Sequence, residues 1–328
     1  MNGRRQCAFH LRLTRAKTSG YPDAMTADPL REITKEEISD FHRDGAVLLK
    51  GVLASEWVDL LREGTDAAIA NPDVMSENLG TLRVDQFPAA KSPALQRIVD
   101  ESPLAEIAGR ALGSAVRFYM DQLFFKPKGL FLPTPWHQDT CYYNLEGDAL
   151  VRAWVSPDRV SREVSLEVVR GSHLWNVTYS PLAGRDPDLD ADARVMLESA
   201  RAGEPMLGVD AYDDWNYFSG VRDNSLPKVP DIEGHRDSYE ILGWDYEPGD
   251  VILFHGHILH AAGGNVASQT PRRAHASLWA GSDVRYLHRV GQVIPDPRAL
   301  YKYEPKSGQP LSEFPEVFPV AWSPDPAG

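Results

Sequence analysis

The sequence predicts a mainly β protein, a β-sandwich or barrel backed by helices, and three observations support this fold class. Residues 34–112 carry the start and stop signals of helices. From residue 116 onward, short runs rich in β-branched and aromatic residues are bounded by Gly, Pro and Asp. Short strands that follow a block of helices are typical of a sandwich or barrel with helices packed against it.

The helical block contains segments whose ends can be recognised in the sequence. Thr34 and Glu37 form a capping box before the first helix, and Gly45 ends it. Ser55 is expected to cap the second helix, because its hydroxyl can accept a hydrogen bond from a backbone N–H of the first turn. The remaining signals are the stop at Asn71 and Pro72, the Ser-Pro starts at Ser92 and Ser102, and the final Gly113.

The predicted strands occupy the second part of the chain and are interrupted by one long segment. The strongest strand patterns lie in residues 116–125, 149–156, 164–173, 249–256 and 272–281. Residues 174–240 mix aromatic, acidic and proline residues with weak periodicity. Because such segments inside a domain are usually functional, we expect a lid-like insertion there, within one domain that spans residues 25–328.

The first 24 residues differ in charge from the rest of the chain, with five basic residues and one acidic residue. An Arg-rich, acid-poor start is compatible with a transit peptide. It is also compatible with an upstream start codon, in which case Met25 is the working start. We favour the second interpretation and expect residues 1–24 to form a disordered basic extension.

Composition excludes two classes of partner. The 328 residues are 42% hydrophobic and 25% charged, as in ordinary globular proteins, and the net charge of −13 disfavours binding to nucleic acid or to an anionic membrane. No apolar run approaches the length of a membrane span. We therefore expect neither nucleic acid nor a membrane as a partner. Cys7 and Cys141 lie far apart, which fits a reducing cytoplasm better than a disulfide scaffold.

His-x-Asp occurs three times, and its context distinguishes the copies. The copy that begins at His42 lies at the end of a predicted helix, and the copy at His235 lies in a polar segment with no flanking strand. His137 and Asp139 lie beside strand-forming residues in a segment that prolines keep out of a helix. In an extended segment, residues two apart share a face, so this pair is the candidate for binding a metal.

Further histidines follow a predicted strand near the C-terminus, at His255, His257 and His260. Two histidines and one carboxylate are the metal ligands of non-haem Fe(II) oxygenases, which keep open positions for cosubstrate and oxygen. Arg272 then opens another predicted strand, where its guanidinium can bind a carboxylate through two hydrogen bonds. A dicarboxylate whose 2-oxo acid end chelates iron suits this arrangement.

Between about Ile33 and about Trp279, the sequence resembles the phytanoyl-CoA dioxygenase family of Fe(II)- and 2-oxoglutarate-dependent oxygenases. The likeness rests on ordered segments: "EEISDFHRDGAVLLKGVL", "FFKPKG", "TPWHQD", "AWVSPD", "LEVVRGSH", "PGDVILFHGHILHAAGGN" and "RRA". It implies a double-stranded β-helix, a jelly-roll-like barrel flanked by helices.

The resemblance also implies a set of iron ligands. His137, Asp139 and His260 match the family's ligand positions, and Asn265 follows His260 at the family's spacing. His257 remains the alternative to His260, because a shift in strand register would exchange them. Since halogenating relatives have a small residue in place of the carboxylate, Asp139 favours hydroxylation.

The cosubstrate residues are implied in the same way. Arg272 matches the position that binds the distal carboxylate of 2-oxoglutarate, with Arg273 as the alternative, and Lys126 and Trp154 match positions that line the cosubstrate pocket. Ala262 departs from the pattern, because relatives often have a serine there that hydrogen-bonds to the cosubstrate.

The resemblance implies a reaction in which 2-oxoglutarate and O2 yield succinate and CO2 while an unactivated C–H bond of a small-molecule substrate is hydroxylated. Desaturation or cyclisation by the same oxidant is an alternative. A non-catalytic small-molecule-binding barrel and a zinc hydrolase are alternatives from other classes. Succinate production distinguishes the oxygenase from both, because only the oxygenase forms succinate. Tyr143, after the metal-binding pair, and Trp215, in the insertion, are the expected substrate contacts.

Overall fold

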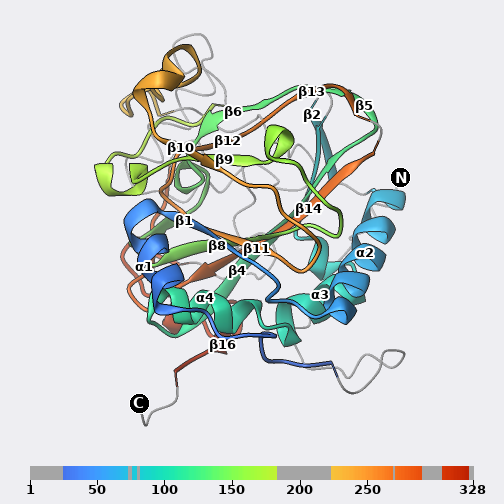
Figure 1. The fold of residues 1–328 in the computed structure, drawn as a ribbon. Helices are drawn as coiled ribbons and strands as arrows, with labels where there is room; N and C mark the ends of the chain where they lie inside the picture. Colours follow the sequence, from blue (N-terminus) through green and yellow to red (C-terminus); the bar gives the residue numbers. More distant parts are fainter. Residues whose placement is uncertain are drawn as a thin grey trace, which may run out of the picture.

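A computed structural model describes residues 25–72, 76–79, 82–182, 223–268, 270–289 and 305–324. The expected basic extension, most of the expected insertion and Trp215 lie outside the described residues. The described part is built around two facing β-sheets, with helices against the outer face of the larger sheet (Figure 1). This is the predicted fold class, a mainly β core flanked by helices.

The larger sheet is antiparallel between all neighbouring strands. Its central strands are buried along their whole length, because one face contacts helices and the other faces the interior of the barrel. In spatial order the strands are β1 (Ala46–Leu49), β11 (Val251–His255), β8 (Leu150–Val155), β14 (Arg272–Ala280), β4 (Val116–Lys126), β3 (Leu82–Gln86) and β2 (Ser76–Leu79), with β16 (Val320–Trp322) also beside β4.

The smaller sheet covers the open face of the larger one. Its order is β10 (Ile241–Gly243), β9 (Leu166–Val169), β12 (His260–Ala262) and β6 (Thr134–His137). The chain passes repeatedly between the two sheets, from β8 to β9, from β10 to β11 and from β11 to β12. This alternation is the winding expected for a double-stranded β-helix. Two short ladders complete the described strands: β13 (Asn265–Ser268) with β5 (Gly129–Phe131), and β15 (Arg285–Tyr286) with β7 (Leu145–Glu146).

The helices are α1 (Lys35–Asp44), α2 (Ser55–Ala70), α3 (Pro93–Glu101) and α4 (Leu104–Leu112). The predicted capping box of Thr34 and Glu37 is present. The prediction for Ser55 is wrong: Ala54 occupies the cap position, and the Ser55 hydroxyl donates to the neighbouring Glu56 carboxylate instead. No helix among the residues described has the length and apolar character that crossing a bilayer requires.

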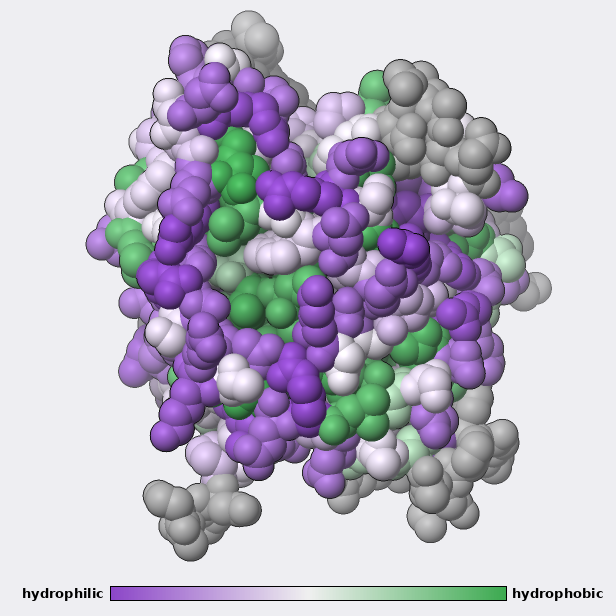
Figure 2. All heavy atoms as spheres, viewed as in Figure 1, coloured by the Kyte–Doolittle hydropathy of each residue, from purple (hydrophilic) through white to green (hydrophobic). Residues whose placement is uncertain are grey.

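The period-two alternation of the central strands sorts their side chains between two environments. On β8, Val151, Ala153 and Val155 belong to the core that packs against the helices. Arg152 and Trp154 therefore face the interior between the sheets. The surface seen in Figure 2 is mostly hydrophilic, with hydrophobic side chains in separate patches. A charged side chain that faces the interior, such as Arg152, is therefore an exception, because charged side chains are rarely buried without a partner.

Candidate metal centre and cosubstrate pocket

His137 and His260 come together because their strands pair in the smaller sheet. His137 is the last residue of β6, His260 is the first residue of β12, and the two residues are direct partners in the antiparallel ladder. Their ring centroids lie 4.2 Å apart. Strand register, which is a long-range property, thus joins two histidines that are remote in the sequence.

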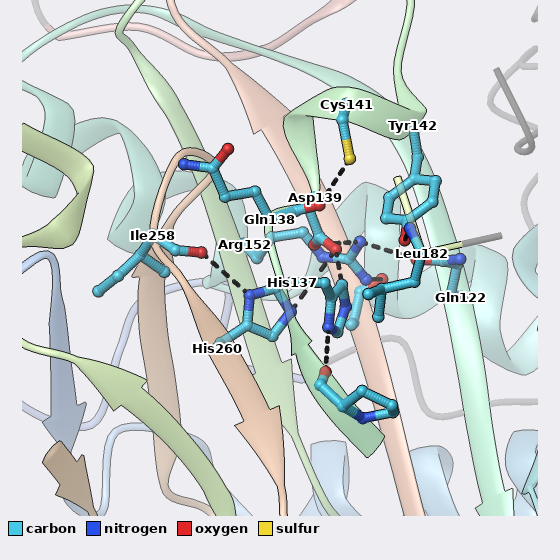
Figure 3. Close-up of polar contacts among 12 residues, drawn as sticks. Gln122, His137, Gln138, Asp139, Cys141, Tyr142, Arg152, Leu182, Ile258 and His260 are labelled. Carbon is cyan, nitrogen blue, oxygen red and sulfur yellow. Dashed lines mark hydrogen bonds and ion pairs between the residues drawn. The ribbon is translucent and has the colours of Figure 1, made fainter. Parts of the chain in front are cut away.

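Asp139 completes the cluster by leaving the strand. The backbone of Asp139 is helical (φ −77, ψ −33) and begins the short 3-10 helix Thr140–Tyr142. The expectation that His137 and Asp139 share one face of an extended segment is therefore wrong. The turn nevertheless carries Oδ1 of Asp139 to 3.7 Å from Nε2 of His137 and 3.6 Å from Nε2 of His260 (Figure 3).

The histidines are oriented as metal ligands. Nδ1 of His137 lies 2.8 Å from the Pro135 carbonyl, and Nδ1 of His260 lies 3.2 Å from the Ile258 carbonyl. Because carbonyl oxygens only accept hydrogen bonds, each Nδ1 carries the hydrogen and each Nε2 keeps its lone pair. Burial lowers the pKa of His260 to about 3, and the neighbouring His137 adds to the effect, so His260 is neutral at pH 7.

The three ligand atoms fit a divalent metal ion. One atom from each of His137, Asp139 and His260 can be chosen so that all lie within 4.8 Å of one another. Two imidazole nitrogens and one carboxylate oxygen form the donor set of non-haem Fe(II) oxygenases. Burial would raise the pKa of Asp139, but its interactions with neighbouring groups, first among them the positive charge of Arg152, lower it, so the carboxylate stays ionised.

Arg152 is a residue that the sequence reasoning missed. Its guanidinium is buried in the barrel and donates from Nη1 to Oδ2 of Asp139 over 3.1 Å. The available signal was local: an arginine stands in the otherwise apolar strand pattern "ALVRAWVS". A charged residue at an interior position of a buried strand needs a buried partner.

Arg272 opens β14 and lies buried beside a small pocket. Its guanidinium lies over the Trp154 ring, with Cζ 5.9 Å from the centroid, and interacts with the Tyr246 hydroxyl. Nη1 of Arg272 is buried without a hydrogen-bond partner among the described residues. An unsatisfied buried guanidinium N–H is costly, and a carboxylate is the ligand that best satisfies it.

Lys126 adds a second cation to this pocket. Nζ of Lys126 donates to the Leu132 carbonyl over 3.0 Å. Burial and, secondarily, the positive charge of Arg272 lower the pKa of Lys126 to about 7. None of the described residues that line the pocket is acidic. The pocket therefore has the chemistry to bind an anionic carboxylate.

The rival candidates face other surroundings. Arg273 points to the opposite side of β14, where it forms ion pairs with Asp158 and Asp66. Nε2 of His257 lies 3.0 Å from the Gly147 carbonyl. His255 packs against Phe41 and His173. The other His-x-Asp copies, at His42 in α1 and at His235 in an exposed turn, also lie outside the cluster.

A cavity of about 390 Å³ opens beside the candidate metal ligands and shares part of its wall with the small pocket of Arg272 and Lys126. Tyr142 lines this cavity, whereas Tyr143 is not among the residues of its wall and contacts Arg152 in the interior. Tyr143 therefore does not hold the expected position of a substrate contact. Most of the wall is apolar and includes Leu82, Val84, Phe124, Leu166, Leu182 and Phe254.

Comparison with known proteins yields consistent matches. A family model described as phytanoyl-CoA dioxygenase (PhyH) matches residues 41–274. An ectoine dioxygenase of Sphingopyxis alaskensis is 23% identical over 251 residues, which cover 71% of this chain and 72% of that protein. An ectoine dioxygenase of Nocardia farcinica is 22% identical over 244 residues, with 72% and 74% covered.

Solved structures match the fold. The non-haem alpha-ketoglutarate-dependent epimerase SnoN from nogalamycin biosynthesis superimposes with a TM-score of 0.62 at 17% identity, covering 88% of this chain and 98% of that one. The carbocyclase SnoK from the same biosynthesis gives 0.61 at 21% identity, covering 92% and 99%. EctD from S. alaskensis with 2-oxoglutarate and 5-hydroxyectoine gives 0.57 at 18%, covering 84% and 86%. These likenesses confirm the predicted double-stranded β-helix.

Proposed function

The chain belongs to the phytanoyl-CoA dioxygenase family and is an iron(II)- and 2-oxoglutarate-dependent oxidoreductase, and we propose that it hydroxylates an unactivated C–H bond of a small organic substrate. One observation carries this proposal: the cluster of His137, Asp139 and His260 lies beside a cavity whose wall continues to the buried cations Arg272 and Lys126. A 2-oxo dicarboxylate suits this arrangement, because its 2-oxo acid end can bind the metal while its other carboxylate binds the cations.

In this proposal His137, Asp139 and His260 hold the iron. When bound, iron, 2-oxoglutarate and O2 supply the oxidising chemistry, in which the cosubstrate becomes succinate and CO2 and a substrate C–H becomes C–OH. The two imidazoles are already held with Nε2 toward the site by the carbonyls of Pro135 and Ile258. The chain therefore needs little rearrangement to present its ligands.

Arg272 and Lys126 bind the far carboxylate of the cosubstrate. Arg272 is held in place, because it starts a buried strand, lies over Trp154 and interacts with Tyr246. Its unsatisfied Nη1 gains a charged acceptor when a carboxylate enters. Lys126 gains stabilisation of its protonated form at the same time, so cosubstrate binding favours proton uptake at this residue.

The cavity determines what kind of substrate can approach. Its wall is mainly apolar, and the exposed side chains of Leu132 and Leu182 belong to it. An apolar wall excludes water from the reacting region and favours a substrate with hydrocarbon surface. A small molecule also agrees with the relatives named for ectoine and for nogalamycin biosynthesis.

We also propose a cytoplasmic location. Cys141 is a free thiol buried in the core, and burial together with the nearby Asp139 charge raises its pKa. A structural thiol of this kind is stable in a reducing compartment.

The test is conversion of 2-oxoglutarate. We expect purified protein supplied with Fe(II) and O2 to release succinate slowly without substrate, and faster when a molecule from a panel of small apolar compounds occupies the cavity. Asp139→Ala should abolish both rates. Equal succinate formation by wild type and Asp139→Ala would contradict the proposed metal centre. Binding of the compounds without any succinate would contradict the proposal in favour of a binding barrel.

Product mass separates the reactions available to this chemistry. Hydroxylation adds one oxygen atom to the substrate, whereas desaturation and ring closure remove two hydrogen atoms. A hydrolase would add water and would release no succinate. Mass spectrometry of the product, run beside the succinate assay, therefore identifies the reaction.

A further inference from the structure

Arg152 places a positive charge in the barrel interior, where an aliphatic residue would ordinarily stand. It lies on β8, between Phe254 of β11 and Leu278 of β14 in the ladder, and its exposed fraction is 1%. A buried charge is expensive unless partners surround it. The contacts of its guanidinium therefore indicate what it does.

Those contacts converge on the metal carboxylate. Nη1 of Arg152 donates to Oδ2 of Asp139 over 3.1 Å and to Oε1 of Gln122 over 2.7 Å (Figure 3). Nη1 also contacts the hydroxyl of Tyr143, which in turn interacts with Asp139. Arg152 thus holds Asp139 both directly and through Tyr143.

The two oxygens of the Asp139 carboxylate have different neighbours. Oδ2 is engaged by Arg152, while Oδ1 lies 3.7 Å from Nε2 of His137 and 3.6 Å from Nε2 of His260. A free carboxylate can rotate and offer both oxygens to a metal, whereas a carboxylate held at one oxygen offers the other.

We propose that Arg152 is the positioning residue of the metal centre: it holds Oδ2 of Asp139 so that Oδ1 alone faces the metal. This inference rests on the proposed function. Its consequence is that the carboxylate would contribute one ligand atom, which would leave more coordination positions of a bound metal for cosubstrate and oxygen.

The support for Arg152 comes from the larger sheet. Gln122 of β4 accepts from Arg152 because its amide is oriented by Gln86 of β3, to which Gln122 Nε2 donates over 2.9 Å. Gln86 and Gln122 are themselves direct partners in the ladder. The histidine ligands belong to the smaller sheet, so Arg152 ties the carboxylate ligand to the opposite wall of the barrel.

Binding of Co(II) to metal-free protein tests the inference without turnover. Affinity is measured by titration, and the visible absorption of bound Co(II) reports its coordination. We expect Arg152→Met to weaken Co(II) binding about 10–100-fold, as for other residues that orient metal ligands, and to alter the spectrum. Arg152→Lys should recover part of the affinity, and Tyr143→Phe should weaken binding to a smaller degree.

Arg273→Met is the matched control, because Arg273 is also a buried strand arginine paired with carboxylates, but away from the metal ligands. It should lower thermal stability and leave Co(II) affinity and spectrum unchanged. A folded Arg152→Met that binds Co(II) like wild type, with the same spectrum, would overturn the inference. If Arg152→Met does not fold, unchanged binding in both Arg152→Lys and Tyr143→Phe would overturn it.

A further variant separates this inference from the proposed function. If Asp139→Ala binds Co(II) as tightly as wild type, the cluster of His137, Asp139 and His260 is not the metal site and the proposed function fails. If Asp139→Ala loses binding while Arg152→Met keeps it, the proposed function stands and only the role of Arg152 is wrong.

Discussion

Arg272 and Lys126 are direct partners across strands β14 and β4, and both cationic side chains are buried against the same small pocket. Two buried positive charges at one ladder position repel each other, and this repulsion contributes to the low pKa of Lys126. An anionic ligand between them relieves the repulsion. We therefore expect the protonation of Lys126 to be coupled to binding of an anion in this pocket.

The affinity for 2-oxoglutarate should fall as pH rises above about 7, where Lys126 loses its proton. The direction follows from the linkage between protonation and binding. The carboxylate binds better when Lys126 is protonated, so above pH 7 binding must be accompanied by uptake of a proton, and the affinity falls. We expect a several-fold increase in the dissociation constant between pH 7 and pH 9, measured anaerobically on metal-loaded protein. Lys126→Met should bind more weakly at pH 7 and lose this pH dependence. A wild-type constant that does not change over this range would contradict the assignment.

Arg272→Leu should raise the KM for 2-oxoglutarate about 10–100-fold, because a charge-assisted hydrogen bond contributes ~1.5–3 kcal/mol. Succinate release against cosubstrate concentration measures this change. Arg273→Leu is the control, since Arg273 pairs with Asp158 and Asp66 and faces away from the pocket. A larger KM change for Arg273→Leu would show that the two arginines have been exchanged.

His260→Ala should remove tight metal binding and succinate formation, because it deletes one of the three proposed ligand atoms. His257→Ala should retain most of both, since its imidazole contacts the Gly147 carbonyl rather than the cluster. Metal content after dialysis and the initial rate of succinate release give the two measurements. Tolerance of His260→Ala together with loss in His257→Ala would reverse the choice of ligand.

Gly45→Ala should destabilise the fold more than Gly113→Ala. Both glycines end helices with positive φ, +80 at Gly45 and +63 at Gly113, so either substitution costs about 1–2 kcal/mol of backbone strain. At Gly45 a Cβ would also lie 2.4 Å from Nδ1 of His173, whereas at Gly113 it would meet nothing within 4 Å. Urea unfolding measures the free energy of unfolding of each variant. Equal losses of this free energy in the two variants would show that the His173 ring moves aside without cost.

Local chemistry determined the features that the sequence could predict. The capping box of Thr34 and Glu37 acts within one helical turn, and the glycine end at Gly45 depends on a single residue, so both were predicted and are present. The strands from residue 116 onward were predicted because their apolar pattern extends over several consecutive residues. Segment order then indicated the family and, through it, the candidate ligands.

Tertiary structure decided which of the similar side chains meet. The pairing of His137 with His260, rather than with His257, is a matter of register between strands that no local signal encodes. The hydrogen bond from Arg152 to Oδ2 of Asp139 likewise depends on how strand β8 packs beside the turn that carries Asp139. A sequence specifies caps and periodicity within a few residues, whereas the distances that make a metal centre arise only when remote strands pack together.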